Sequence, residues 1–278
     1  MKILAPTDHS KLSTVAVIYA AKMAKKFNAE LIIMNAMYSQ ASSRARMVSP
    51  MLEKEMAAIA QRDMEELVTE VKKAVRGPLK ITGKVLQGFP LTSLVMLWIE
   101  KNPVDLIVMG TKGATGLQKI LIGSNAAAMI DHSPVPVIIV PPKATFKSFT
   151  KVVYASDLKD VHQELRLIKD FVKLFNTKID VLHVVPENDA TAFNKKEMKQ
   201  DLIDKMGYPK IDLHIIKEDL IPLAIDNYLI DSKGDMLVMF THKLGFFDKL
   251  FSRSVTRKLV VHSHVPLLSF NKSTFTKK

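Results

Sequence analysis

The chain has 278 residues and a formal net charge of +12, and it contains no cysteine. That length exceeds the roughly 100–200 residues usual for one domain, which predicts two domains that each bury a core. The lack of cysteine excludes disulfide bonds and thiol catalysis. The sequence shows neither a secretory signal nor an apolar run long enough to cross a bilayer, so we expect a cytoplasmic protein without a transmembrane segment.

The positive charge is spread over the chain. Residues 1–142 carry 17 lysines and arginines against 11 acids, and residues 143–278 carry 23 against 17. Because neither half holds the excess alone, nucleic acid is not an expected partner. The clearest basic cluster is Lys249, Arg253 and Arg257, which would share a helix face. We interpret this cluster as a solvated face, with an anion-binding or partner patch as the alternative.

In chain order, short apolar runs alternate with segments of helical spacing. The runs 31–34, 106–109 and 137–140 are continuous, as in strands buried on both faces of a parallel sheet. Apolar stripes in 13–27 and 56–75 indicate helices between strands. This alternation predicts an α/β fold with right-handed crossovers into a doubly wound parallel sheet. Ligands bind such sheets beyond the carboxyl ends of the strands.

A glycine motif follows the apolar run 106–109. Gly110-Thr-Lys-Gly113 forms the turn, and Gly123-Ser124 begins the next helix. Bare backbone allows close approach to an anion, and we expect the tight turn to use positive φ, which glycine adopts freely. N–H groups at a helix N-terminus favour phosphate. The alternative is that these glycines serve only a strand–turn–helix connection.

The spacing G-x2-G-x9-G-S resembles the nucleotide-binding signature of the ATP-binding universal stress proteins. The segments 3–10, 29–36 and 84–90 are similar to the family's first three strands, and 134–140 is similar to its closing strand. The resemblance therefore covers about residues 1–142. It implies a Rossmann-like sheet with strand order 3-2-1-4-5.

The resemblance also implies a ligand, ATP or another adenine nucleotide (AMP or ADP), with Mg²⁺ held by the phosphates. In this reading Asp8 lies near the ribose, Ala36 and Met109 border the base, and the glycine turn surrounds the phosphates. The full set of expected nucleotide-binding residues is Pro6, Thr7, Asp8, Ala36, Met109, Gly110, Lys112, Gly113, Gly123, Ser124, Asn125 and Ala126.

The second half of the chain repeats the first. Residues 105–109 recur as 235–239, and 132–136 recur as 262–266, both 130 positions later. The predicted domains are 1–142 and 150–278, two tandem sheets of the same type, joined by a short linker that begins with two prolines. In the second copy the glycines have changed: Gly110, Gly113 and Gly123 correspond to Phe240, Lys243 and Arg253. We therefore expect repeat 2 to be degenerate in nucleotide binding.

Three functions remain open at this point. The first is a nucleotide-binding regulatory protein of the stress response, and the second is a slow ATPase or phosphotransferase that uses the same pocket. The third is an interaction scaffold with a vestigial pocket. The loop lacks the G-x-x-x-x-G-K-[ST] pattern, and no water-activating base is evident beside the phosphates, which favours binding without efficient turnover. No catalytic residue is assigned.

No metal site is predicted. His242, His262 and His264 are close in sequence, but no acidic or cysteine ligand accompanies them. For assembly, the segments 135–140 and 265–270 should each be the last strand of a sheet, at an open edge. Related single-domain proteins form dimers through this strand. We therefore expect the two repeats to pair through these strands within one chain, and homo-oligomers remain open.

Overall fold

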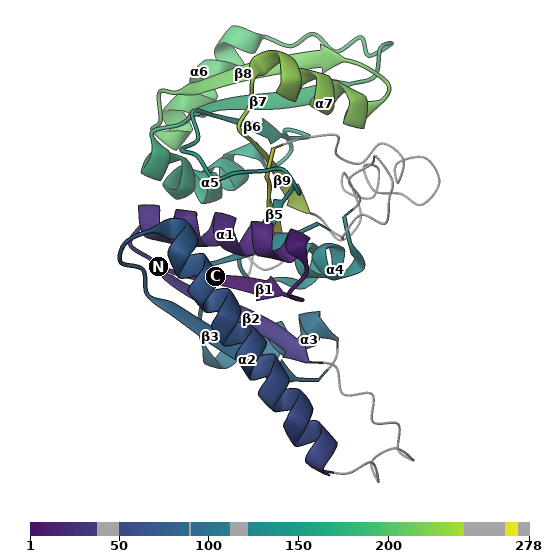
Figure 1. Ribbon diagram of the computed structural model, residues 1–278. Helices are drawn as coiled ribbons and strands as arrows, with labels where there is room; N and C mark the ends of the chain where they lie inside the picture. Colours follow the sequence, from purple (N-terminus) through teal and green to yellow (C-terminus); the bar gives the residue numbers. More distant parts are fainter. Residues whose placement is uncertain (38–49, 89, 112–121, 242–264, 272–278) are drawn as a thin grey trace. The chain divides into compact units, whose positions relative to one another are not determined.

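The computed structural model describes residues 1–37, 50–88, 90–111, 122–241 and 265–271 (Figure 1). The described residues form two compact units. Unit 1 contains those from Met1 to Phe146, and unit 2 contains those from Lys147 to Asn271. No helix within these residues is both long and apolar enough to cross a membrane.

Unit 1 is an α/β fold with a parallel sheet. Its order along the chain is β1 (Lys2–Thr7), α1 (Lys11–Lys26), β2 (Glu30–Met37), α2 (Pro50–Val75), β3 (Ile81–Gln87), α3 (Leu91–Lys101), β4 (Leu106–Gly110), α4 (Ser124–His132) and β5 (Val137–Val140). The strand order is β3-β2-β1-β4-β5, and the paired strands run parallel. The predicted order 3-2-1-4-5 is confirmed. Helix α1 packs beside α2, and α3 packs beside α4.

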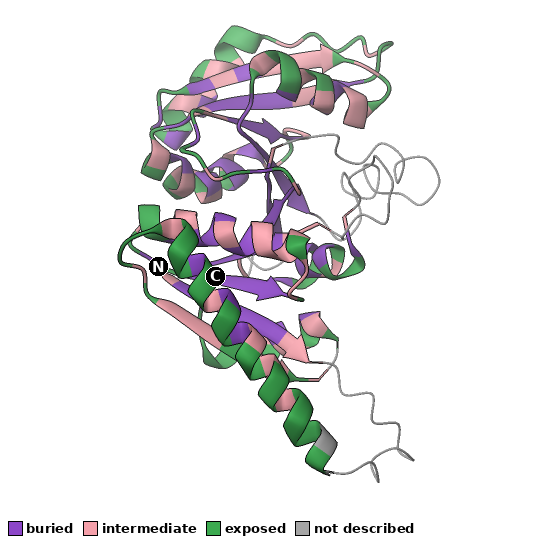
Figure 2. Cartoon of the chain, in the orientation of Figure 1, coloured by how far each residue is buried: buried purple, intermediate pink, exposed green. Residues whose placement is uncertain are grey.

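The inner strands of unit 1 are buried because helices cover both faces of the sheet. Leu31–Met34 of β2 and Leu106–Met109 of β4 are all buried, whereas β3 at the edge is only partly covered (Figure 2). Helix α1 turns Val17, Ala20 and Met23 toward this core. Continuous apolar runs therefore mark the inner strands, as the sequence predicted.

Unit 2 has the same topology. Its elements are β6 (Lys151–Ala155), α5 (Val161–Phe175), β7 (Lys178–Val185), α6 (Lys195–Met206), β8 (Ile211–Lys217), α7 (Ile221–Ser232), β9 (Met236–Thr241) and β10 (Leu267–Asn271). The order β8-β7-β6-β9-β10 corresponds strand for strand to that of unit 1, and the pairs are again parallel. The predicted fold class, two doubly wound parallel sheets in tandem, is confirmed.

Candidate functional site

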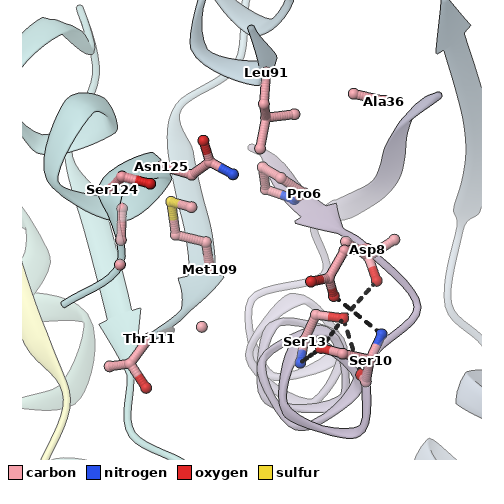
Figure 3. Close-up of a pocket in the computed structure, with 14 residues that line it drawn as sticks. Pro6, Asp8, Ser10, Ser13, Ala36, Leu91, Met109, Thr111, Ser124 and Asn125 are labelled. Atoms are coloured by element: carbon pink, nitrogen blue, oxygen red, sulfur yellow. Dashed lines mark hydrogen bonds between the residues drawn. The ribbon is translucent and has the colours of Figure 1, made fainter. Parts of the chain in front are cut away.

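A cavity of about 460 Å³ opens at the carboxyl ends of β1 and β4 in unit 1 (Figure 3). Its volume lies within the range of roughly 300–1,000 Å³ that is typical of small-molecule sites. Parallel strands direct their carboxyl ends to one edge, so residues distant in sequence meet there. The lining residues are Pro6, Thr7, Asp8, Ser10, Ser13, Ala36, Leu91, Met109, Gly110, Thr111, Gly123, Ser124, Asn125 and Ala126.

The end of β1 contributes a carboxylate held by hydroxyl groups. The Ser10 N–H donates to Asp8 Oδ1 at 3.0 Å, and Ser10 is the N-cap of α1, its Oγ accepting from the Ser13 N–H at 3.2 Å. Burial raises the pKa of Asp8, but hydrogen bonds from Ser10 and Ser13 outweigh burial and hold the pKa below its usual value. Asp8 is therefore an ionised acceptor at neutral pH, suited to hydroxyl groups of a ligand.

Apolar side chains form another wall of the cavity. Met109 comes from β4, Ala36 from β2, Pro6 from β1 and Leu91 from the first turn of α3 (Figure 3). The ends of β1 and β2 are tied together, because Asn35 Nδ2 donates to the Thr7 backbone oxygen at 2.9 Å. This wall offers the surface that a flat aromatic base requires.

The start of α4 supplies backbone donors. Gly123 is the N-cap, with no hydrogen bond from a capping side chain, and Ser124 and Asn125 follow on the exposed first turn. The first N–H groups of a helix have no intrahelical acceptor, and the helix dipole favours negative charge beside them. The cavity therefore has an anion-compatible end at α4, in addition to the carboxylate of Asp8 and the apolar wall.

The glycines of this site do not use positive φ where the structure describes them. Gly123 has a φ of −68°, and Gly110 is not among the described glycines with positive φ. The expectation of positive φ in the tight turn is therefore wrong at Gly110, and Gly113, the other glycine of that turn, lies outside the described residues. Gly110 has a packing reason instead: an added Cβ would lie 3.3 Å from the Leu12 backbone oxygen and 3.7 Å from Ala16 Cβ, so a bare residue lets β4 approach α1 closely.

The structure brings together most of the residues that the sequence predicted for this site. Lys112 and Gly113 lie outside the described residues, and every other predicted residue lines the cavity. The lining residues that the sequence analysis missed are Ser10, Ser13, Leu91 and Thr111. Their positions gave a signal in retrospect, since the two serines follow Asp8 at the start of a helix and Leu91 follows a Gly-x-Pro turn.

At the corresponding place in unit 2, aromatic side chains pack together. Phe240, which corresponds to Gly110, is buried and lies with its ring centroid 4.8 Å from that of Phe270. Tyr154 of β6 meets Phe240 at 5.8 Å with the rings nearly perpendicular. The Tyr154 hydroxyl donates to the carboxylate of the buried Glu164 and accepts from the Ser156 hydroxyl at 3.0 Å. Several residues that the sequence analysis singled out lie outside the described residues. They are Lys243 and Arg253 of the altered motif, the histidines His242, His262 and His264, and Lys249 and Arg257 of the basic cluster.

Comparison with known proteins places this geometry in a family. The model of the "Universal stress protein family" matches residues 1–141. The chain belongs to the universal stress protein family. Universal stress protein MJ0531 of Methanocaldococcus jannaschii is 35% identical over 146 residues, which cover 50% of this chain and 81% of that protein. Universal stress protein MJ0577 of the same organism is 27% identical over 156 residues, covering 51% of this chain and 95% of the relative.

A solved structure extends the likeness of fold to both units. The crystal structure of a universal stress protein from Archaeoglobus fulgidus has a TM-score of 0.73 and covers 97% of this chain and 96% of that one. Its sequence identity is 21%, so this likeness concerns the fold alone.

Proposed function

We propose that this universal stress protein binds an adenine nucleotide, ATP, ADP or AMP, in the cavity of unit 1, and that occupancy regulates it in a stress response. The observation that carries the proposal is the convergence of three chemistries on one cavity: the Asp8 carboxylate, an apolar wall and the N-terminus of α4. A nucleotide presents matching parts, namely ribose hydroxyls, a flat base and phosphates.

Each part of the ligand has an expected position. Asp8 accepts from the ribose hydroxyls, and Ala36 and Met109 border the base. The phosphates lie against Gly123, Ser124 and the backbone beside them, where the N–H groups of α4 favour negative charge. Among the described lining residues Asp8 is the one carboxylate, so Mg²⁺ would be held mainly by the phosphates.

We propose further that unit 2 does not bind nucleotide, which makes the stoichiometry one nucleotide per chain. The packing of Phe240 against Phe270 and Tyr154 supports this, because these rings occupy the place where unit 1 has Gly110 beside its cavity. Because buried rings pack closely, they leave no room for a ligand in the volume that they fill.

Binding without efficient turnover is the preferred form of this function. Hydrolysis needs a group that orients the attacking water and groups that stabilise the developing charge. Among the described lining residues Asp8 is the one acid, and it is engaged by Ser10 and assigned to the ribose. The slow ATPase and the scaffold with a vestigial pocket are the alternatives that the experiment below separates.

We also propose that the last strands of the two repeats pair within one chain. β5 is the last strand in the order of unit 1, and β10 is the last in that of unit 2. Open apolar edges favour aggregation, and a short linker keeps the two edges at high effective concentration.

The experiment that tests nucleotide binding uses calorimetry of the full chain with ATP, followed by denaturation and chromatography of the released nucleotide. Wild type should bind one ATP and release it unchanged. Asp8→Ala should weaken binding at least tenfold, because the ribose loses a charged acceptor. The matched control is Asp157→Ala, at the corresponding position of unit 2, which should bind like wild type. Unchanged affinity in Asp8→Ala, or an equal loss in both variants, would overturn the assignment.

A further inference from the structure

Unit 2 buries a carboxylate in its sheet where the fold does not require one. Asp180 of β7 has a side chain only 1% exposed, and its register partner on β8 is Asp212. The corresponding pair in unit 1 is Ile32 of β2 and Thr82 of β3. Burying a carboxylate costs several kcal/mol unless partners compensate. Since the same topology forms with isoleucine at this position, the sheet itself does not explain Asp180.

His214 completes a group of three side chains that can bind a metal ion. It lies two residues after Asp212 on β8, so both side chains face the same side of the sheet. His214 Nε2 is 3.8 Å from Asp180 Oδ1 and 3.9 Å from Asp212 Oδ2, and the three ligand atoms lie within 4.8 Å of one another. Ligands about 2.0–2.2 Å from a tetrahedral ion are roughly 3.3–3.6 Å apart, so small movements suffice.

The hydrogen bonds around these side chains direct the two carboxylates. The Tyr228 hydroxyl donates to Asp180 Oδ2 at 2.9 Å, and the Leu213 N–H donates to Asp212 Oδ1 at 3.0 Å. The opposite oxygens, Asp180 Oδ1 and Asp212 Oδ2, face His214 and the Lys178 ammonium. Asp180 Oδ1 and His214 Nε2 are both buried; within the described part of the chain His214 Nε2 has no hydrogen-bond partner, whereas Asp180 Oδ1 is ion-paired with Lys178. Metal ligands are commonly oriented by such outer partners.

A lysine ammonium lies between these two oxygens. Lys178 Nζ is 3.1 Å from Asp180 Oδ1 and 3.4 Å from Asp212 Oδ2. Two other ammonium groups lie on the far oxygens: Lys151 Nζ is 3.6 Å from Asp180 Oδ2, and Lys199 Nζ is 3.2 Å from Asp212 Oδ1. The Lys178 side chain is 42% exposed, so its flexible stem can move the ammonium into water. Lys178 therefore marks a place where positive charge is stabilised and from which it can be displaced.

We propose that Asp180, Asp212 and His214 form a site for a divalent transition-metal ion such as Zn²⁺, which displaces the Lys178 ammonium. One imidazole nitrogen and two carboxylate oxygens suit Zn²⁺ better than Mg²⁺ or Ca²⁺, which prefer oxygen ligands alone. The bound ion fastens β7 to β8 and stabilises unit 2 by mass action. Its residues belong to unit 2, so the proposal does not depend on nucleotide binding in unit 1.

The test is calorimetric titration of Zn²⁺ into the full chain after chelator treatment and without nucleotide, together with thermal melts. Wild type should bind one Zn²⁺ through this site and melt at a higher temperature with it. His214→Ala should weaken binding at least tenfold. Lys178→Met should tighten binding, because the competing ammonium is gone; a merely structural ion-pair network would not gain affinity for Zn²⁺. If His214→Ala does not fold, Asp212→Asn removes a second ligand by a nearly isosteric change instead.

The matched control is His162→Ala. His162 belongs to unit 2 as well, and its Nε2 lies 3.0 Å from a single carboxylate, that of Asp201. Zn²⁺ binding by this variant should equal that of wild type. The proposal is overturned if neither wild type nor Lys178→Met binds Zn²⁺ saturably, or if His162→Ala lowers the affinity as much as His214→Ala. In the first case Lys178 is itself the permanent counter-ion of the two carboxylates.

Discussion

Phe240 stacks on Phe270, with ring centroids 4.8 Å apart and the ring planes inclined by 10°. The two residues are register partners on β9 and β10, and the corresponding partners on β4 and β5 are Gly110 and Val140. One topology thus carries an aromatic cluster at this place in unit 2 and a cavity beside Gly110 in unit 1. The strands of the two units pair in the same way. At this place the units differ in the volume of a few side chains.

The first prediction concerns the aromatic cluster. Phe240→Ala should lower the free energy of unfolding by about 3–5 kcal/mol, because it leaves a cavity among buried rings. Chemical denaturation measures the loss. Phe193→Ala, which removes a partly exposed ring of the same unit, should cost clearly less. A loss below about 1 kcal/mol for Phe240→Ala would show that the stacking contributes little.

The second prediction concerns the phosphate end of the cavity. Gly123→Val should weaken ATP binding at least tenfold, because a branched side chain enters the space that the phosphates need. Gly123 has a φ of −68° and a ψ of 159°, which a β-branched residue can adopt, but valine is a poor N-cap, so stability should fall by about 1 kcal/mol. Calorimetry with ATP, supported by a thermal melt, measures both quantities. Wild-type affinity in a folded Gly123→Val protein would place the phosphates elsewhere.

The third prediction is that ATP hydrolysis by the full chain stays slower than about 1 per second, the lower end for typical enzymes. The physical reason is the lack of a second acid or base beside Asp8 among the described lining residues. Steady-state release of phosphate measures the rate, with Asp8→Ala as the control for contaminating ATPases. Faster release that disappears in Asp8→Ala would favour the enzymatic alternative.

The sequence predicted the fold and much of the candidate site because both depend on local signals. Leu31–Met34 is a continuous apolar run, which a strand buried on both faces requires. Asp8 directly follows β1 and Gly110 ends β4, and parallel strands carry such residues to one edge of the sheet. The serines at the start of α1 were missed because Ser10 has the ordinary appearance of an N-cap.

Other features depend on register and packing, which no local pattern reveals. The cluster of Asp180, Asp212 and His214 forms only because β7 and β8 pair in one register. Gly110 lines the cavity but does not have the positive φ that was expected, and its bare backbone also lets β4 approach α1 closely. The sequence shows that glycine lacks a side chain. It does not show which neighbouring group needs the space that a side chain would fill.

The fourth prediction tests the pairing of the two repeats. Ile138 is in the middle of β5, and Leu267 begins β10. Replacing both by lysine should place charge on each edge strand and separate the repeats, which small-angle scattering would detect as a larger radius of gyration. Lysine at the exposed Leu97 of α3 is the control, and it should leave the profile unchanged. A compact profile in the double variant would contradict pairing through these strands.

The last prediction concerns pH and the Asp235 carboxylate, which precedes β9. Its side chain is 6% exposed, and Oδ2 accepts from the Thr150 N–H at 2.7 Å, the Thr150 hydroxyl at 2.6 Å and the Lys151 N–H at 3.1 Å. Lys147 Nζ lies 2.8 Å from Oδ1. Burial raises the pKa of Asp235, but these partners outweigh it and lower the pKa below its usual value. The stabilisation is therefore complete above the unfolded-state pKa of about 3.9 and is lost as the pH falls through the folded-state value.

Asp235→Asn should accordingly cost about 2–4 kcal/mol at pH 7, because buried N–H groups and an ammonium lose a charged acceptor. The deficit relative to wild type should shrink as the pH falls below about 3.9, because the unfolded chain then takes up a proton that the folded carboxylate resists. Urea denaturation at pH 7 and pH 3 measures it. The control is Asp105→Asn at the corresponding position of unit 1, where the side chain is 61% exposed and accepts from the Lys2 N–H at 2.6 Å. Solvent screening should keep that loss below about 1 kcal/mol. Equal losses in the two variants, or a deficit in Asp235→Asn that is the same at both pH values, would show that the charge on Asp235 is not what stabilises the start of β9.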